Sequence, residues 1–450
     1  MKIQNSSELH FIFYILCFTF FISSCGITKQ ISKSAKQSVI NDSSLLNAHI
    51  GISIYETGAN KYWYNYNGEK YFVPASNTKI PTCYAAMKYL GDSLVGARIS
   101  ITKDSVLEIY PSGDPTFLNS EFKFQPLFQI IKRFKNIRWD VTNWKSKNWG
   151  NGWSWNDYDA SYMVERSSFP IYGNLATFII SKDTLKSFPS IVVIHYDTTV
   201  GYNPENRKVK LNKFTIERSL GENEYYLRKS NSVFNPTLIP FKTEIPFISQ
   251  LLEDTLNAEN VSTFSIADGY DYSVRKKTIH SQPTDSLLKP MMHNSDNFFA
   301  EQTLLMVSNE RLGYMNDAKI IDSLLKTDFK DLPQKPRWVD GSGLSRYNLF
   351  TPQDFVAILN KMKNEFGMNR IKEIFATGGE GTISSYYNSD SGFIYAKTGT
   401  LSGVVALSGF LTTKKGKQLL FSVLINNHQA SATAVRKAIE KFIQSIRNKY

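Results

Sequence analysis

Ser76 and Lys79 are the first residues whose types and spacing could do chemistry. If a helix begins near the serine, both side chains lie on one helix face, because residues three apart are neighbours there. The lysine amine could then take the serine proton, provided that burial or a second cation lowers the lysine pKa. The same Ser-x-x-Lys spacing begins at other serines as well: Ser100, Ser120, Ser273, Ser286 and Ser323. The spacing alone therefore proves nothing.

Two more elements of the same chemistry occur later in the chain. Ser295-Asp296-Asn297 opens a predicted helix, and Lys397-Thr398-Gly399-Thr400 lies on a predicted strand. The first element offers a hydroxyl to relay a proton and an amide to orient the lysine and the substrate. The second offers another cation, which could bind a carboxylate. Ser-x-Asn is weak by itself because it also occurs at Ser146 and Ser154, but Lys-Thr-Gly occurs once.

In this order, the three elements resemble the signature of penicillin-binding proteins and serine β-lactamases. Further blocks resemble the D-alanyl-D-alanine carboxypeptidase/endopeptidase family, the class C low-molecular-mass penicillin-binding proteins. These blocks are Gly113-Asp114-Pro115-Thr116, Trp153-Ser154-Trp155-Asn156-Asp157, Asp340-Gly341-Ser342-Gly343-Leu344-Ser345-Arg346 and Gly381-Thr382, and the helix-opening motif extends to Glu301. The resemblance covers the chain from about residue 48 to its end.

The resemblance implies a fold and an activity. The fold would be α/β: a transpeptidase/β-lactamase-like domain, with an antiparallel sheet flanked by helices, interrupted by a large β-rich insert. The activity would be that of a serine-type D-Ala-D-Ala carboxypeptidase, an endopeptidase, or both, acting on peptidoglycan stem peptides without a cofactor, with β-lactams as covalent inhibitors. A β-lactamase or esterase of the same fold, or a non-catalytic cell-wall binding protein, are the alternatives.

The resemblance also implies roles for single residues. Ser76 would be the acylated nucleophile and Lys79 its general base. Ser295 would relay a proton to the leaving group, and Asn297 would bind Lys79 and the substrate amide.

The strand motif would bind the substrate's end. Lys397 and the hydroxyls of Thr398 and Thr400 would hold the terminal carboxylate, with Gly399 part of the same substrate-binding strand. The backbone amides of Ser76 and Thr400 would form the oxyanion hole.

A second pocket is implied for a diaminopimelate side chain. Its residues would be Asp157, Tyr162 and Arg346. The chemistry is sensible, because a carboxylate pairs with an ammonium group and a guanidinium with a carboxylate. Ordinary surface ion pairs are the alternative explanation for the same residues.

The N-terminus indicates export. Residues 11–22 are nearly all apolar and too short to span a bilayer, and Ser23-Ser24-Cys25-Gly26 follows. Small residues ending at a cysteine resemble the lipobox of bacterial lipoproteins. We therefore expect residues 1–24 to be a signal peptide, Cys25 to be lipidated and the protein to face the periplasm from a membrane anchor. A plain signal peptide is the alternative.

Composition excludes several other classes. Hydrophobic residues make up 42% and charged residues 20% of the chain, as in a soluble globular protein. The net charge is +12, but the charges are scattered and no basic run is interleaved with aromatics, so we predict a solvated basic surface and no nucleic-acid partner. The six histidines have no metal-ligand spacing, and no Gly-x-Ser-x-Gly elbow is present, so neither a zinc site nor a Ser-His-Asp triad is predicted.

The remaining pattern predicts how the chain is organised. Residues 25–47 are polar and predicted to be a tether, 48–95 the first part of the transpeptidase domain, 96–274 the β-rich insert and 275–450 the second part. Strands are predicted over residues 49–56, 61–66, 395–401, 403–411 and 418–426, besides several in the insert. Helices are predicted over residues 82–90, 296–307, 318–326, 352–366 and 431–447. Pro81 predicts a tight or kinked first helical turn after Ser76.

Overall fold

The computed structural model describes residues 26–450, except for 191–193, 197–199, 211, 257–261 and 266–275. The chain divides into two compact units. Of the described residues, the first unit contains those up to Ile80, Asp331–Arg337 and Asn348–Tyr450, and the second contains those of Pro81–Lys330 and Trp338–Tyr347. Within the described ranges, no helix has the length and apolar character needed to cross a bilayer.

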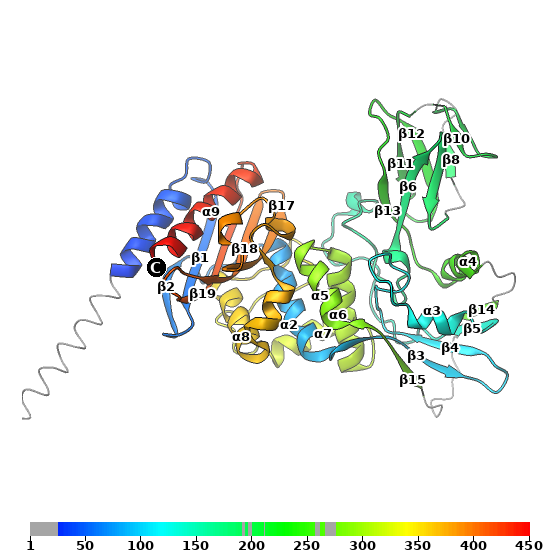
Figure 1. Ribbon diagram of the computed structural model, residues 1–450, viewed down its shortest axis with the longest axis horizontal. Helices are drawn as coiled ribbons and strands as arrows, with labels where there is room; N and C mark the ends of the chain where they lie inside the picture. The colour runs from blue at the N-terminus through cyan, green and yellow to red at the C-terminus, as the bar shows by residue number, and fades with distance from the viewer. Residues whose placement is uncertain (1–25, 191–193, 197–199, 211, 257–261, 266–275) are drawn as a thin grey trace, which may run out of the picture. The chain divides into compact units, whose positions relative to one another are not determined.

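A six-stranded antiparallel sheet forms the centre of the first unit (Figure 1). Its order is β16-β17-β18-β19-β1-β2. The strands are β1 (His49–Glu56), β2 (Lys61–Tyr66), β16 (Ala376–Thr377), β17 (Ile394–Leu401), β18 (Val404–Thr412) and β19 (Gln418–Asn426). β1 pairs with β19 along its whole length, with Ile52 opposite Val423. Strands from distant parts of the chain therefore complete one sheet.

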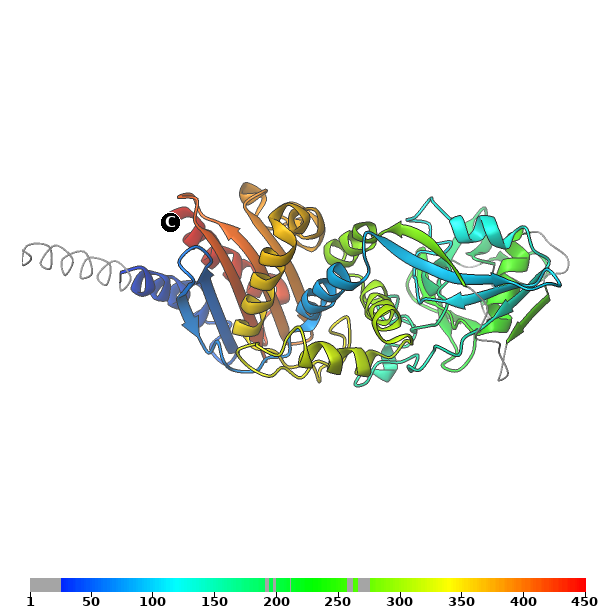
Figure 2. The same cartoon turned by 90° about the horizontal axis from the view of Figure 1, so that it is seen from below.

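Helices cover both faces of this sheet (Figure 2). α8 (Pro352–Ile374) packs on one face and α9 (Ala432–Lys449) on the other. Ile52 shares a buried core with Phe442 of α9. Because successive strand side chains point to opposite faces, Gly51 faces the other helix, and an added Cβ there would lie 2.8 Å from the first residue of α8. The α/β architecture predicted for the transpeptidase part is confirmed.

The segment predicted to be a polar tether, residues 25–47, is packed against α9 over much of its described length. Residues 26–35 are helical and continue into the π-helical turn η1 (Lys36–Ile40). Side chains four positions apart join the core of the first unit: Ile31, Ala35 and Val39. The hydroxyl of Tyr450 also hydrogen-bonds to Gln30 Oε1 at 2.9 Å. This spacing makes an apolar helical stripe, which the polar residues around it concealed.

The second unit contains the predicted β-rich region. One five-stranded sheet has the order β14-β5-β4-β3-β15, another the order β13-β6-β7-β10-β9, and a three-stranded sheet the order β11-β12-β8. The strands of the first of these are β3 (Ser93–Ile101), β4 (Leu107–Pro111), β5 (Asn136–Trp139), β14 (Ser262–Ser265) and β15 (Lys277–Pro283). Because β15 pairs with β3, this sheet extends past residue 274, where we expected the insert to end.

The other strands of the second unit are short. They are β6 (Leu175–Ser181), β7 (Thr184–Phe188), β8 (Ile194–Tyr196), β9 (Tyr202–Asn203), β10 (Lys208–Val209), β11 (Phe214–Arg218), β12 (Tyr225–Lys229) and β13 (Thr237–Pro240). Two helices in this region, α3 (Pro126–Ile131) and α4 (Ile245–Leu256), were not predicted. One buried core, which includes Trp139 and Phe178, joins the sheets and both helices.

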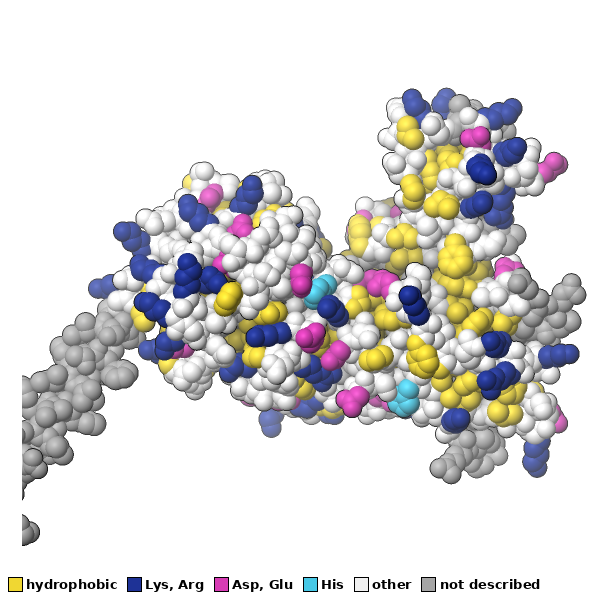
Figure 3. Space-filling view, in the orientation of Figure 1, with side chains coloured by type: hydrophobic (Ala, Val, Ile, Leu, Met, Phe, Trp, Pro, Cys, Tyr) yellow, Lys and Arg dark blue, Asp and Glu magenta, His cyan; other side chains and the backbone are white. Residues whose placement is uncertain are grey.

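The helices that carry the sequence motifs follow. They are α2 (Lys79–Tyr89), whose first residues belong to the first unit, and α5 (Thr284–His293), α6 (Asn297–Leu312) and α7 (Asp317–Lys326) of the second. Lys and Arg side chains are spread over the visible surface and form no single patch there (Figure 3). This view agrees with the solvated basic surface that the composition predicted.

Candidate active site

Ser76 lies in a tight turn at the start of a helix. The 3₁₀ turn η2 (Ala75–Thr78) leads directly into α2. Lys79 Nζ lies 3.0 Å from Ser76 Oγ. Lys79 is fully buried, whereas Ser76 is partly exposed. Pro81 falls in the first turn of α2, where backbone N–H groups have no intrahelical partner, so the helix tolerates it after the tight turn that the sequence predicted.

The backbone around Ser76 is held in an uncommon conformation. Ala75 has φ 48°, in the left-handed region that residues with a side chain rarely adopt. Thr78 Oγ1 donates a hydrogen bond to Ala75 O at 2.9 Å. Asn77 Nδ2 donates to Ser408 Oγ on β18 at 2.7 Å. Such strain persists only where the surroundings fix it, and these bonds fix the turn that presents the serine.

Strand β17 brings a second lysine to the same turn. Gly399 makes this possible, because an added Cβ would lie 2.6 Å from Pro74 O and 3.0 Å from Ser76 N. Only a glycine therefore lets the strand approach the serine amide this closely. Lys397, two residues earlier on the same face of the strand, is fully buried and donates from Nζ to Thr398 O at 3.0 Å.

The two lysines affect each other. Burial, and to a smaller extent the charge of Lys79, lower the pKa of Lys397 well below its ordinary value. The repulsion between two ammonium groups is mutual, so it disfavours protonation of both at once. A lysine base next to a serine must be able to lose its proton, and a second cation close to it favours that loss.

The threonines of the strand motif face the other way. Thr398 Oγ1 hydrogen-bonds to Thr382 Oγ1 at 2.7 Å. Thr400 Oγ1 accepts a hydrogen bond from Nη2 of Arg436, on α9, at 2.7 Å. Sequence reasoning missed Arg436, since no motif surrounds it and its contact joins residues far apart in the chain.

Ser295 and Asn297 lie in the second unit, and the other three predicted catalytic residues in the first. Ser295 has φ 59°, again in the left-handed region. Asp296 caps α6 by accepting the Phe299 N–H at 2.8 Å. Asn297 begins the helix, and its Nδ2 donates to Tyr162 O at 2.8 Å. The structure thus joins the helix motif to the segment that carries Tyr162.

The residues of the predicted second pocket lie on two packed segments. Burial first, and then the neighbouring Asp157 carboxylate, raise the pKa of Tyr162. Arg346 is exposed on the segment Trp338–Tyr347. Trp153 Nε1 donates to Asp340 Oδ2 at 3.0 Å and so ties the two segments together.

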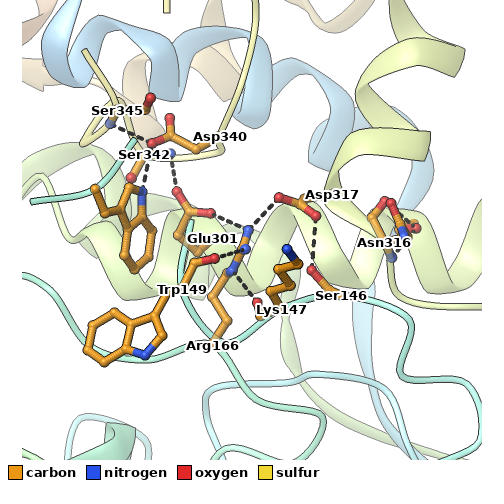
Figure 4. Close-up of polar contacts among 12 residues, drawn as sticks. Ser146, Lys147, Trp149, Arg166, Glu301, Asn316, Asp317, Asp340, Ser342 and Ser345 are labelled. Carbon is orange, nitrogen blue, oxygen red and sulfur yellow. Dashed lines mark hydrogen bonds and ion pairs between the residues drawn. The ribbon is translucent and has the colours of Figure 1, made fainter. Parts of the chain in front are cut away.

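The second unit also contains a buried ion network that was missed from the sequence (Figure 4). Arg166 is 1% exposed, and its Nη1 lies 2.6 Å from Asp317 Oδ2 and 3.3 Å from Glu301 Oε2. Its Nε and Nη2 donate to the carbonyl oxygens of Lys147 and Trp149 at 3.1 and 3.0 Å. One guanidinium therefore holds two acidic side chains and the loop before Trp153.

The acidic side of the network holds the glycine-rich loop. Glu301 Oε1 accepts the Ser342 N–H at 2.8 Å, and Asp340 Oδ2 accepts the Ser345 N–H at 2.7 Å. Burial and the charge of Asp340 raise the pKa of Glu301 to about 7, against the opposing effect of Arg166. For Asp317, burial is outweighed by Arg166, so its pKa is lowered.

The glycine-rich loop also touches α6 directly. An added Cβ at Gly341 would lie 2.7 Å from Ala300 O. The close contact and the network fix the segment bearing Arg346 against the helix that follows Ser295. Glu301 and Asp340 belong to blocks that resemble the family, so their place in those blocks was the available signal. Cys25, the predicted lipidation site, lies outside the described residues.

Comparison with known proteins identifies the family. The model of the D-Ala-D-Ala carboxypeptidase 3 (S13) family matches residues 33–446. The D-alanyl-D-alanine carboxypeptidase of Actinomadura sp. (strain R39) is 25% identical, over 89% of this chain and 82% of that protein. The D-alanyl-D-alanine carboxypeptidase DacB of Haemophilus influenzae is 24% identical, over 90% of each.

A solved structure shows the same fold. Penicillin binding protein 4 (dacB) from Haemophilus influenzae superposes with a TM-score of 0.69 at 20% identity, covering 92% of this chain and 98% of that one. The family resemblance stated from the motifs is confirmed. Because the family model spans most of its length, this chain belongs to the D-Ala-D-Ala carboxypeptidase 3 (S13) family.

Proposed function

We propose that Ser76 is the residue through which this serine-type D-alanyl-D-alanine carboxypeptidase cleaves its substrate. The observation that carries the proposal is the 3.0 Å distance between Ser76 Oγ and Lys79 Nζ, with the buried Lys397 beside Lys79. A serine hydroxyl is a weak nucleophile, and an adjacent neutral amine removes that weakness by taking the proton.

The reaction would proceed in two steps. Lys79 takes the Ser76 proton while Oγ adds to the carbonyl carbon of the penultimate D-Ala. The backbone N–H groups of Ser76 and Thr400 stabilise the oxyanion. Collapse breaks the C–N bond, the leaving D-Ala amine takes a proton through Ser295, and an acyl ester remains on Ser76. Water then hydrolyses the ester and frees the serine.

The substrates would be peptidoglycan stem peptides, and β-lactams would acylate the same serine. Endopeptidase cleavage of cross-links uses the same acyl transfer with a larger leaving amine. Asn297 would orient Lys79 and the substrate amide, as proposed from the motif. Asp157, Tyr162 and Arg346 would bind the charged ends of a diaminopimelate side chain, which their carboxylate and guanidinium groups suit.

We also propose that Cys25 carries a lipid that anchors the protein to a membrane, facing the periplasm. This rests on the small residues before Cys25 and the apolar segment before them. Mass spectrometry of the N-terminal peptide from membranes tests it, and an unmodified Cys25 there would reject the anchor.

Intact-mass analysis after penicillin treatment tests the role of Ser76. The wild type should gain the mass of one penicilloyl group, and Ser76→Ala should gain none. Ser323→Ala is the matched control, because Ser323 and Lys326 have the same spacing on α7, and it should be labelled like the wild type. A label on Ser76→Ala would reject the assignment.

Two further measurements separate the alternatives. A long-lived penicilloyl adduct together with release of D-Ala from a D-Ala-D-Ala peptide is the expected result. Rapid release of hydrolysed penicillin would favour a β-lactamase. Absence of peptide turnover by labelled protein would favour a non-catalytic cell-wall binding protein.

A further inference from the structure

Arg436 is a permanent positive charge next to the strand motif. It lies in the second turn of α9, is partly exposed, and donates from Nη2 to Thr400 Oγ1 at 2.7 Å. Its Nε is buried and has no hydrogen-bond partner among the described residues. A guanidinium offers five N–H donors in a planar fork, so most of its capacity is unused here.

The geometry of β17 separates this cation from Lys397. Ala396 lies in the core shared with α9, so the side chains of Thr398 and Thr400 point to the same face. Lys397 and Gly399 point to the opposite face, where Ser76 lies. The two positive groups therefore approach the substrate-binding strand from different sides.

The two cations also differ in how firmly they hold their charge. Burial and Lys79 lower the pKa of the fully buried Lys397 well below its ordinary value, whereas a guanidinium stays protonated throughout the usual pH range. Lys397 is suited to handling protons next to the nucleophile. Arg436 adds a second cation beside the strand motif, and a guanidinium can pair with a carboxylate through two parallel hydrogen bonds.

The hydroxyl between them is oriented by this contact. Thr400 Oγ1 uses a lone pair to accept from Arg436, so its own hydrogen must point elsewhere and can be donated to a ligand oxygen. Arg436 lines a small, mostly apolar pocket together with Thr398, Tyr386 and Ile439. An apolar wall strengthens a charge-assisted hydrogen bond made beside it.

We propose that Arg436, together with the hydroxyl of Thr400, binds the terminal carboxylate of the substrate and makes the enzyme select free acids. This inference rests on the proposed function, because it places the substrate's end along β17. It assigns the carboxylate to a residue outside the sequence motifs.

Paired substrates test the proposal. One is a peptide ending in D-Ala-D-Ala as the free acid, and the other is the same peptide with a C-terminal amide. In Arg436→Gln, kcat/KM for the acid should fall roughly 10- to 100-fold, as for a lost hydrogen bond to a charged group, mainly through KM. The rate on the amide should stay nearly unchanged, so the preference for the acid should collapse.

Two other variants sharpen the test. Arg436→Lys keeps the charge without the fork and should lose part of the preference. Lys437→Gln removes the neighbouring exposed positive charge. If Arg436 acted only through long-range electrostatics, this variant would lose preference for the acid as well. We expect it to keep the wild-type preference. Should Arg436→Gln fail to fold, the lysine variant decides, and an unchanged preference there would overturn the proposal.

Penicillin labelling distinguishes a failure of the proposed function from a failure of the proposed role of Arg436. A wild type that is neither acylated at Ser76 nor active on the acid peptide would reject the proposed function, and this inference with it. Normal acylation of Ser76, with an unchanged acid-to-amide ratio in Arg436→Gln, would reject the role of Arg436 alone.

Discussion

The two units of this protein bury charged side chains in opposite ways. In the first unit, Lys79 and Lys397 are fully buried near each other, and burial, followed by the charge of Lys79, lowers the pKa of Lys397. In the second unit, the buried Arg166 lies between the carboxylates of Glu301 and Asp317. Like charges make a proton easy to release, whereas opposite charges hold groups in place.

The lysine pair and the Arg166 network also differ in the role for which their surroundings suit them. The lysine pair adjoins a serine hydroxyl and a left-handed backbone residue, and so combines two unfavourable features at one turn. Strain and perturbed charges gather where a protein does chemistry. The arginine network bonds to backbone carbonyl and N–H groups of two loops, which is the arrangement of a structural clamp.

Replacing Lys79 should have the largest effect on activity. Lys79→Met removes the proposed base, so the rate constant for acylation by penicillin should fall by roughly 10²- to 10⁴-fold. The melting temperature should be no lower than that of the wild type, because an apolar side chain replaces a buried amine that lies close to a second buried lysine.

Lys88→Met, on the same helix but partly exposed, is the matched control and should keep normal acylation. A large loss of stability in Lys79→Met with little loss of acylation would reverse the comparison between the two units.

Replacing Arg166 should have the largest effect on stability. Arg166→Met leaves buried carboxylates without their cation, which should cost about 3–5 kcal/mol of unfolding free energy in a denaturant titration. Lys326→Met breaks an exposed ion pair with Asp322, whose N–O distance of 2.7 Å is close to the 2.6 Å between Arg166 and Asp317. This variant should lose less than about 1 kcal/mol of unfolding free energy. Equal costs for the two variants would show that the Arg166 network is no clamp.

The smallest expected effect is on the pH dependence of stability. The pKa of Glu301 is about 7 in the folded protein and 4.5 ordinarily, so between these values the folded state binds more protons than the unfolded state. The free energy of unfolding should therefore fall as pH rises from 4.5 to 7 and level off above.

Glu301→Gln should make this fall shallower, by a few kcal/mol at most, in urea titrations across the range. Asp354 of the first unit, whose pKa burial raises to about 6, is present in both proteins and cancels in the difference. Identical slopes for wild type and variant would contradict the raised pKa of Glu301.

Sequence patterns predicted the central sheet best. β1, β2 and β19 have the predicted bounds, because alternation with β-branched and aromatic residues is a strong local signal. The helix after Ser76 starts slightly earlier than residue 82, since the turn carrying the motif merges into it. In the insert, α3 and α4 were missed among short strands whose turns dominate the local composition.

The sequence predicted only those site residues that belong to a motif of residues close together in the chain. Ser76 and Lys79 are three positions apart, and the motif at Lys397 occurs once, so both could be singled out. Arg436 reaches Thr400 across 36 positions, and Arg166 reaches Asp317 across 151, and nothing near either arginine marks it. Such pairs depend on how the chain folds back on itself, which single-sequence patterns do not contain.

If Cys25 carries the proposed lipid, the docking of residues 26–40 on α9 would limit where the enzyme could work. If residues 25–47 formed an extended tether, the folded enzyme could move up to about 75 Å from its attachment point. Because residues 26–40 pack against the first unit, a lipid on Cys25 would hold that unit close to the membrane. Such a peptidase would process the wall layer next to its own membrane and leave distant strands to other enzymes.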